Sequence, residues 1–193
     1  MRRGWLYIIG LVLVVAAIAA IFIAMGNSNK SQNDKTSQSS SQKPASSPTF
    51  TKREACKIFT LADAKQVLGD NVKGGSNPVD SSSDDLSVST CTYTQDTGSN
   101  VPVSSSKSAT LLVRSPKTGA GITSNQNQFG YLKPADSQHV AGYGDNAYWD
   151  QQYGQLNILK HNTWYIVSNG PITPSDRTLD DAKQLADVLI NKM

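Results

Sequence analysis

The sequence predicts an α+β domain with a mostly antiparallel sheet, an N-terminal and a C-terminal helix packed on it, and a single transmembrane helix before it. Three observations lead to this prediction. A 21-residue stretch near the start of the chain carries no charge, and apolar residues recur at helical spacing near both ends of residues 51–193. Three short strand-like segments follow one another through connections of two and four residues, as in antiparallel hairpins.

The uncharged stretch spans residues 5–25, and Gly10 is its one member outside the apolar set. As a helix it would rise about 31 Å, which matches the hydrocarbon core of a bilayer. A secretory signal peptide has a shorter apolar region of about 7–15 residues. We therefore expect an uncleaved signal-anchor that binds the lipid bilayer through residues 5–25, with cleavage after Gly26 as the alternative.

The flanking charges predict the orientation of this helix. Arg2 and Arg3 lie in residues 1–4, which favours a cytoplasmic N-terminus and an extracytoplasmic domain. Lys30 and Lys35 lie on the far side and weaken this preference. The expected location is the cell membrane, in a single pass.

Residues 26–50 form a linker rich in Ser, Gln and Asn, in which Ala45 is the one apolar member of residues 27–49. Such a tract buries too little apolar surface to offset its ordering entropy, so we expect it to be disordered. Its root-mean-square reach would be about 25–30 Å. It would hold the extracytoplasmic domain, residues 51–193, off the membrane.

The charge of the chain excludes one class of partner. The chain holds 18 Lys and Arg against 15 Asp and Glu, but residues 51–193 hold 13 against 14. The excess positive charge therefore belongs to the N-terminal tail. Nucleic-acid affinity rests largely on Lys and Arg that neutralise phosphates, so we expect no nucleic-acid partner.

The first half of the domain begins with a short helix. Thr60 is a good N-cap with Asp63 three residues later, and Gly69 marks the end of the helix. The apolar stripe between them is Leu61, Ala64, Val67 and Leu68. We expect a loop over residues 71–85, because they are rich in Gly, Ser and Asp.

Strands are predicted over 86–94, with Cys91 and Tyr93 on one face, and over 109–114. A helix is predicted over 122–132, with Phe129 and Leu132 facing inward.

The second half contains the hairpin strands and the last helix. Strands are predicted over 147–150, 155–160 and 163–168, and the last of these is apolar on both faces, as in a central strand. Residues 169–171 (Asn-Gly-Pro) should end it. An amphipathic helix should follow, started by Ser175 or Asp176. Its apolar stripe is Leu179, Ala182, Leu185, Ala186 and Leu189.

The cysteine content agrees with an oxidising compartment. Cys56 and Cys91 are the two cysteines of the chain, and such a pair is typical of an exported domain with one disulfide. A bridge between them would stabilise the domain by about 3–4 kcal/mol. Two buried free thiols are the alternative.

Four segments resemble a known family. They are C-x-x-F-T-x-x-D-A-x-x-x-L-G over 56–69, Cys-Thr-Tyr over 91–93, Gly-Tyr-Gly-Asp-Asn-Ala-Tyr over 142–148, and A-x-x-L-A over 182–186. Together they resemble a domain of unknown function found in actinobacterial cell-envelope lipoproteins and secreted proteins. The resemblance covers most of residues 54–193 and implies a disulfide and an envelope location, but no reaction. This chain differs by carrying an apolar span where those proteins carry a lipid anchor.

The candidate ligand-binding residues belong to an aromatic cluster. Eight of the 14 aromatic residues lie within residues 129–165, among several Asn and Gln side chains. Flat rings beside amides suit a sugar or a peptide, whereas packing of aromatic pairs across strands is the competing explanation. In a strand Tyr148 and Trp149 face opposite ways, so we expect at least one exposed ring. The candidate contact residues are Tyr143, Asp145, Tyr148, Trp149 and Tyr153.

Catalytic motifs are weak in this sequence. His139 and His161 are the two histidines, and no G-x-S-x-G motif is present. The candidates for a carboxylate pair are Asp84, Asp85, Asp145 and Asp150. Asp84 and Asp85 lie in a Ser-rich loop, and Asp145 lies between Gly144 and Asn146, where an aspartate commonly caps a turn. No spacing typical of a metal site and no phosphate-binding loop occurs. We predict no catalytic residue, no metal and no cofactor.

These observations predict a membrane-anchored extracytoplasmic binding or interaction domain of the cell envelope that is not an enzyme. The expected partner is a cell-wall glycan, a peptide or a membrane protein. Two alternatives remain open: an envelope hydrolase that uses Asp145 or Asp150, and a structural or sensory subunit of a membrane complex.

Overall fold

The computed structural model describes residues 50–76, 80–98, 102 and 106–193, which belong to one compact unit. The predicted membrane span over 5–25 and the predicted linker, apart from Phe50, lie outside these residues. Within the described residues, no helix is both long enough and apolar enough to span a bilayer.

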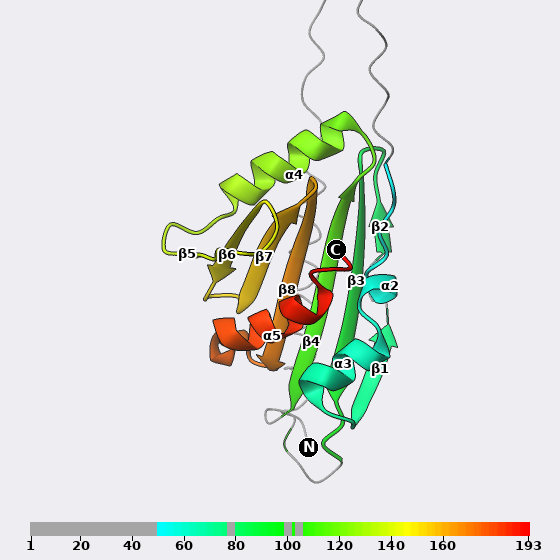
Figure 1. Ribbon diagram of the computed structural model, residues 1–193, viewed down its shortest axis with the longest axis vertical. Coiled ribbons are helices and arrows are strands. Elements are labelled where there is room, and N and C mark those ends of the chain that lie inside the picture. Colours follow the sequence, from blue (N-terminus) through cyan, green and yellow to red (C-terminus); the bar gives the residue numbers. More distant parts are fainter. Residues whose placement is uncertain (1–49, 77–79, 99–101, 103–105) are drawn as a thin grey trace, which may run out of the picture. The chain divides into compact units, whose positions relative to one another are not determined.

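Eight strands pair within the described residues to form one sheet, in which every pairing is antiparallel. The order across the sheet is β1-β3-β4-β8-β7-β6-β5, and β2 pairs with β3. Long strands β3, β4 and β8 form the centre (Figure 1). In chain order the strands are β1 (Val72–Ser76), β2 (Asp80–Ser82), β3 (Leu86–Gln95), β4 (Lys107–Pro116), β5 (Gln138–His139), β6 (Asn146–Asp150), β7 (Gln155–Lys160) and β8 (Thr163–Pro171).

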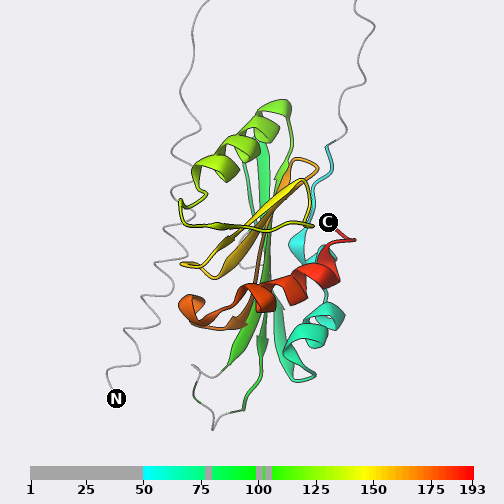
Figure 2. The same ribbon diagram turned by 60° about the vertical axis from the view of Figure 1, so that its left-hand side comes forward.

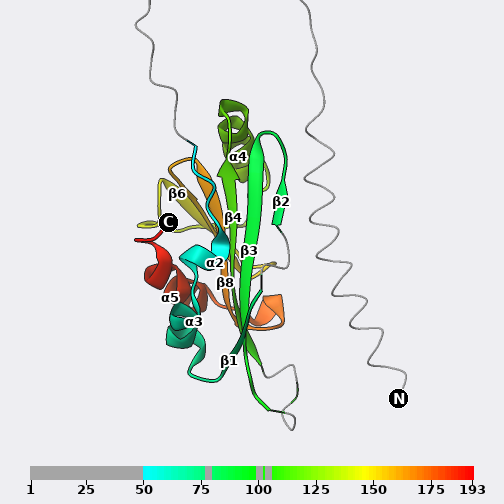
Figure 3. The same ribbon diagram turned by 90° about the vertical axis from the view of Figure 1, so that its right-hand side faces the viewer.

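Three helices cover one face of the sheet, which we name the first face. They are α2 (Ala55–Ile58), α3 (Leu61–Leu68) and α5 (Leu179–Leu189), and all three lie on the same side of the sheet in Figure 3. Alternate residues of the strands pack against these three helices. The central contributions from the strands are Cys91, Tyr93, Ala109, Leu111, Val113, Trp149, Leu156, Ile158, Tyr165 and Val167.

The opposite face, named the second face, is covered at one end by α4 (Gly119–Tyr131), which lies across the upper part of the sheet in Figures 1 and 2. Phe129 packs edge-on against Tyr148 and Trp164, with ring centroids 4.9 and 5.9 Å away. Arg114 donates to Gln128 Oε1 and to Ser124 Oγ of α4, and its guanidinium lies 5.8 Å from the Trp164 ring centroid. Helices therefore lie on both faces of the sheet, with α4 at its upper end in Figure 1 and α3 and α5 nearer its other end.

The capping signals of the first helix are confirmed. Thr60 Oγ1 accepts from the backbone N–H of Asp63 at 3.4 Å, and the Thr60 N–H donates to Asp63 Oδ2 at 2.9 Å. This reciprocal pair satisfies two backbone donors at the start of α3. Leu61, which belongs to the predicted apolar stripe, is exposed, whereas Ala64 and Leu68 are buried.

The predicted loop over 71–85 is wrong in part, because it contains β1 and β2. Both strands pair with β3. Their Gly, Ser and Asp side chains give no strand signal, and the backbone hydrogen bonds to β3 decide their conformation instead.

The end of the sheet and the start of the last helix also differ from prediction. Strand β8 continues through Pro171, which lies opposite Lys107 of β4. Because Pro171 is the last residue of β8, its missing N–H does not interrupt the ladder. Helix α5 is capped by Thr178, whose hydroxyl accepts from the Asp181 N–H at 3.1 Å. Ser175 and Asp176 instead lie in a short 3-10 helix, η2 (Pro174–Asp176).

Helix α4 begins three residues earlier than predicted and ends at Tyr131, one residue before the predicted end. Thr118 caps it, and Gly121 in its first turn lies so close to the β2–β3 turn that a Cβ there would be 2.1 Å from Asp85 O. Phe129 is buried as expected, but Leu132 is 39% exposed. Leu132 follows the last helical residue, so the helical spacing no longer directs its side chain inward.

Cys56 and Cys91 form the predicted disulfide. It joins α2 to the central strand β3, with the two Cα atoms 5.0 Å apart. The bridge therefore ties the N-terminal helices to the sheet.

Candidate functional site

Tyr148 and Trp149, two of the predicted contact residues, are buried. Tyr148 is 2% exposed on the second face, beneath Phe129, and Trp149 is 3% exposed in the core of the first face. The expectation that at least one of these rings is exposed is wrong, because Phe129 of α4 covers Tyr148 and the first-face core encloses Trp149. Burial, followed by the nearby charge of Asp150, raises the pKa of Tyr148.

Tyr143 packs at the edge of the first-face core. It is half-buried, and its hydroxyl donates to Asp187 Oδ1 of α5 at 2.7 Å. Burial, with a smaller effect of Asp187, raises the pKa of Tyr143 to about 12. The ring therefore holds the loop before β6 against α5.

Asp145 is exposed and holds two turns together. Its N–H donates to Leu159 O at 2.7 Å, and its Oδ2 accepts from the His161 N–H at 2.8 Å. Gly144 permits this close approach, because a Cβ at this position would lie 2.5 Å from Leu159 O. Asp145 thus fixes the turn between β7 and β8.

Tyr153 lies at the other end of β6, in the turn to β7, and is 47% exposed. Asp150 is buried beside it, and its Oδ1 accepts from the Tyr153 N–H at 3.2 Å. Asp145 directly precedes β6 and Asp150 is its last residue, so their Cα atoms are about 16 Å apart along the strand. Carboxylate pairs in glycosidases are about 5–9.5 Å apart. The two candidate acids are therefore not placed as such a pair.

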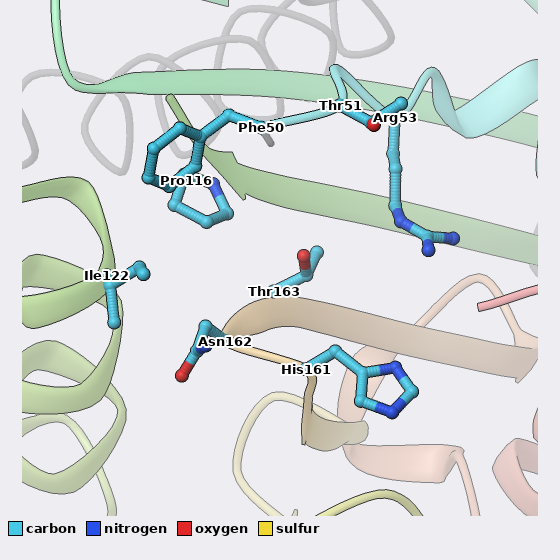
Figure 4. Close-up of a pocket in the computed structure, with 8 residues that line it drawn as sticks. All are labelled: Phe50, Thr51, Arg53, Pro116, Ile122, His161, Asn162 and Thr163. Atoms are coloured by element: carbon cyan, nitrogen blue, oxygen red, sulfur yellow. The ribbon is translucent and has the colours of Figure 1, made fainter. Parts of the chain in front are cut away.

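A pocket of about 220 Å³ lies next to the β7–β8 turn, which Asp145 holds in place. Figure 4 shows its walls, which come from the incoming chain, the end of β4, helix α4 and the β7–β8 turn. The eight lining residues are Phe50, Thr51, Arg53, Pro116, Ile122, His161, Asn162 and Thr163.

The β7–β8 turn forms one wall of the pocket because of its backbone conformation. His161 and Asn162 both have positive φ, at 49° and 63°, as in the two-residue turns that match the twist of a hairpin. Helix α4 holds this turn from one side: Asn125 Nδ2 donates to Asn162 O at 2.8 Å, and Gln126 Nε2 donates to Asn162 Oδ1 at 3.0 Å.

The incoming chain forms the opposite wall. The Arg53 N–H donates to Ser115 Oγ of β4 at 3.3 Å, and the Ala55 N–H donates to Ser89 Oγ of β3 at 3.0 Å. Two serines on the first face thus hold the chain across the central strands, and Phe50 lies at its start.

The pocket has a polar and an apolar side. Arg53 and His161 approach it from one side, and Phe50, Pro116 and Ile122 lie on the other (Figure 4). Such a combination of apolar walls and a few polar groups is typical of small-molecule sites, although this cavity is smaller than the ~300–1,000 Å³ of sites for drug-sized ligands. It suits a small group.

Of the predicted site residues, the structure brings Asp145 next to this pocket, through His161, and leaves Tyr153 at the far end of β6. The sequence analysis missed Arg53, which no motif marks and which only the packing of residues 50–55 on the sheet brings to His161. Among the described residues, no group of three or more His, Cys, Asp or Glu side chains is arranged to hold a metal ion.

Comparison with known proteins adds no relative: no family model, no curated protein and no solved structure matches this chain.

Proposed function

We propose that this chain is a single-pass protein of the cell envelope whose extracytoplasmic domain binds a ligand or a partner and catalyses no reaction. One observation carries the binding role: the pocket between residues 50–53, α4 and the β7–β8 turn combines Arg53 and His161 with an apolar wall. Side chains hold the backbone around it: Ser115 of β4 and Ser89 of β3 accept from the N–H groups of Arg53 and Ala55, and Asn125 of α4 donates to Asn162 O. A pocket that is formed before the ligand arrives loses little ordering entropy on binding.

The envelope location is supported by the chemistry of the chain. Residues 5–25 have the length and apolarity of a membrane anchor, and Arg2 and Arg3 precede them. The disulfide between Cys56 and Cys91 suits an oxidising compartment. The pocket includes Phe50, at the end of the proposed linker, so a bound ligand would lie close to the point where the tether meets the domain.

The competing hydrolase hypothesis has less support. Asp145 Oδ2 accepts from the His161 N–H, and Asp150 Oδ1 accepts from the Tyr153 N–H, so each carboxylate stabilises a turn. If Asp145 were a catalytic acid or base, Asp145→Asn would retain the fold and lose turnover of a cell-wall substrate. A screen of wall polymers with the full chain and this variant separates the two hypotheses.

Location is tested with the full chain carrying a C-terminal tag, expressed in bacterial cells. We expect the protein to stay in the membrane fraction through a high-salt wash and the tag to be digested by protease added outside intact spheroplasts. A tag that is digested only after lysis would contradict the proposal.

Binding is tested with the detergent-solubilised full chain and a digest of cell-wall peptides and glycans, by ligand-observed NMR. We expect a subset of fragments to bind and Arg53→Gln to weaken them, whereas Lys65→Gln, which removes a charge from an exposed position on α3, leaves binding unchanged. If no fragment binds at millimolar concentration, wall ligands are excluded. The proposal then requires that a protein partner be captured from membranes by the unsubstituted chain and that Arg53→Gln weaken this capture. Binding that is insensitive to Arg53→Gln would contradict the proposed site.

A further inference from the structure

The chemistry of the pocket restricts the class of ligand. An arginine guanidinium presents five N–H donors and no acceptor. Among the described residues, the Arg53 guanidinium has one hydrogen-bond acceptor, Lys192 O, which lies 3.3 Å from Nη1. Most of its N–H donors are therefore directed to solvent or to a ligand. A guanidinium binds a planar carboxylate best, because it donates two parallel hydrogen bonds to the two carboxylate oxygens.

Nearby carboxylates of the protein are engaged elsewhere. Asp145 Oδ2 accepts from the His161 N–H, and Asp63 Oδ1 accepts from Lys192 Nζ. Neither aspartate lines the pocket. Within the part of the chain that the structure describes, no carboxylate lines the pocket and competes with an incoming anion for Arg53.

The opposite wall selects the rest of the ligand. Phe50, Pro116 and Ile122 face Arg53 and His161 across the cavity (Figure 4). Contact with an aliphatic group removes the three apolar side chains from water, which is favourable. Inorganic phosphate would satisfy Arg53 but leave this wall in contact with water. The volume of about 220 Å³ limits the aliphatic group to a small one.

We propose that the pocket binds a carboxylate carried on a small aliphatic residue, as found at the C-terminus of a peptide or in a free acylated amino acid. Arg53 holds the carboxylate, the Asn162 amide supplies a polar contact beside it, and Phe50 and Ile122 contact the aliphatic side chain. This inference rests on the proposed binding function and names the ligand chemistry of the same site.

The test compares an acid with its neutral amide. N-acetylalanine, as both enantiomers, and N-acetylalaninamide are titrated into the full chain in detergent at 0.15 M salt, with ligand-observed NMR as the readout. We expect the acid to bind roughly tenfold or more tightly than the amide, the difference expected for a charge-assisted hydrogen bond. Acetyl-alanyl-alanine distinguishes the two sources of the carboxylate: tighter binding than N-acetylalanine indicates a peptide C-terminus, and equal binding indicates the free acid.

Two variants locate the effect. Arg53→Gln should weaken the acid roughly tenfold or more and leave the amide unchanged, and Ile122→Ser should weaken acid and amide alike. Lys65→Gln is the control for loss of one positive charge, and an unchanged melting temperature shows that each variant is folded. Equal affinities for acid and amide, no saturation by the acid at about 10 mM, or an Arg53→Gln variant that binds the acid normally would each overturn the ligand class.

These failures are distinguishable from failure of the proposed function. If other wall fragments bind in an Arg53-dependent way while the acids do not, the binding role stands and the carboxylate chemistry is wrong. If neither the fragments nor any membrane partner depends on Arg53, both proposals fall.

Discussion

Lys192 Nζ lies 2.5 Å from Asp63 Oδ1, which joins the segment after α5 to the first turn of α3 across 129 residues of sequence. The same carboxylate caps α3 by accepting from the Thr60 N–H. Burial of Asp63 acts to raise its pKa, but the hydrogen bonds from Lys192 and Thr60 together outweigh this effect and lower the pKa below its ordinary value of 3.8.

This lowered pKa predicts an acid-sensitive contribution to stability. A carboxyl group with a lower pKa in the folded state stabilises the fold above its unfolded-state pKa, and the contribution is lost as the pH falls below about 4. Because Lys192 is half exposed, we expect Asp63→Asn to lower the free energy of unfolding by about 1 kcal/mol at pH 7. The difference from the unsubstituted chain should shrink toward pH 2.5.

Urea unfolding at both pH values measures this difference. Asp70→Asn, at an exposed position just after α3, is the matched control and should change stability little at either pH. An Asp63→Asn deficit that is equally large at pH 2.5 and pH 7 would show that the loss arises from packing and not from charge.

Removal of the disulfide should destabilise the domain strongly. Cys56 and Cys91 are 35 residues apart in sequence, and closing a loop of this length contributes about 3–4 kcal/mol in the chain-entropy model. We expect the double variant Cys56→Ala and Cys91→Ala to lose this amount in urea unfolding. In the unsubstituted chain, alkylation of the denatured protein should require prior reduction, and two thiols that react without reductant would refute the bridge.

Helix α4 should depend on one aromatic anchor. Phe129 packs against Tyr148 and Trp164, so Phe129→Ala leaves a cavity between α4 and the sheet. We expect a loss of about 3 kcal/mol. Tyr131→Ala, two residues later on the same helix and 78% exposed, is the control and should change stability by less than about 0.5 kcal/mol. Similar losses for both variants would mean that α4 is not anchored through Phe129.

The raised pKa of Tyr143 predicts that the domain loses stability at alkaline pH. Its pKa is raised to about 12, first by burial and then by Asp187, from an ordinary value of 10. A group with a raised pKa stabilises the folded state fully below pH 10, and the contribution is lost as the pH rises toward 12. Tyr143→Phe should therefore be about 1 kcal/mol less stable than the unsubstituted chain at pH 8, because one hydrogen bond is lost.

The gap between these two proteins should narrow at pH 11. Urea unfolding followed by far-ultraviolet circular dichroism measures it, and Tyr131→Phe, at an exposed ring, should match the unsubstituted chain at both pH values. A gap that stays constant from pH 8 to pH 11 would argue against a raised pKa at Tyr143.

Local patterns predicted most of the regular structure. The capping pair Thr60 and Asp63 marks the start of α3, and the spacing of Leu185 and Leu189 marks α5. The two-residue connection His161-Asn162 predicts the hairpin of β7 and β8. Strands β1 and β2 were missed, because apart from Val72 their residues lack the β-branched or aromatic character of a strand, and their pairing with β3 arises from tertiary contact.

The candidate site was harder to predict for the same reason. The alternation of Tyr148 and Trp149 correctly places the two rings on opposite faces, but it gives no information about what covers each face. Here α4 covers one ring and the first-face core covers the other. Arg53 and His161 are separated by more than 100 residues, and nothing in the sequence pairs them.

Local signals in the chain predict the α+β class, the short helix at 61–68, the last helix, the hairpin strands and the pairing of both cysteines in one bridge. These features depend on side-chain spacing and capping within a few residues, or on the presence of just two cysteines. Packing between distant segments, in contrast, sets which faces are buried, which weak segments become strands and where a pocket forms. Each of these depends on the distant segment that packs there, because burial and pairing are properties of contacts between segments and not of the segments themselves.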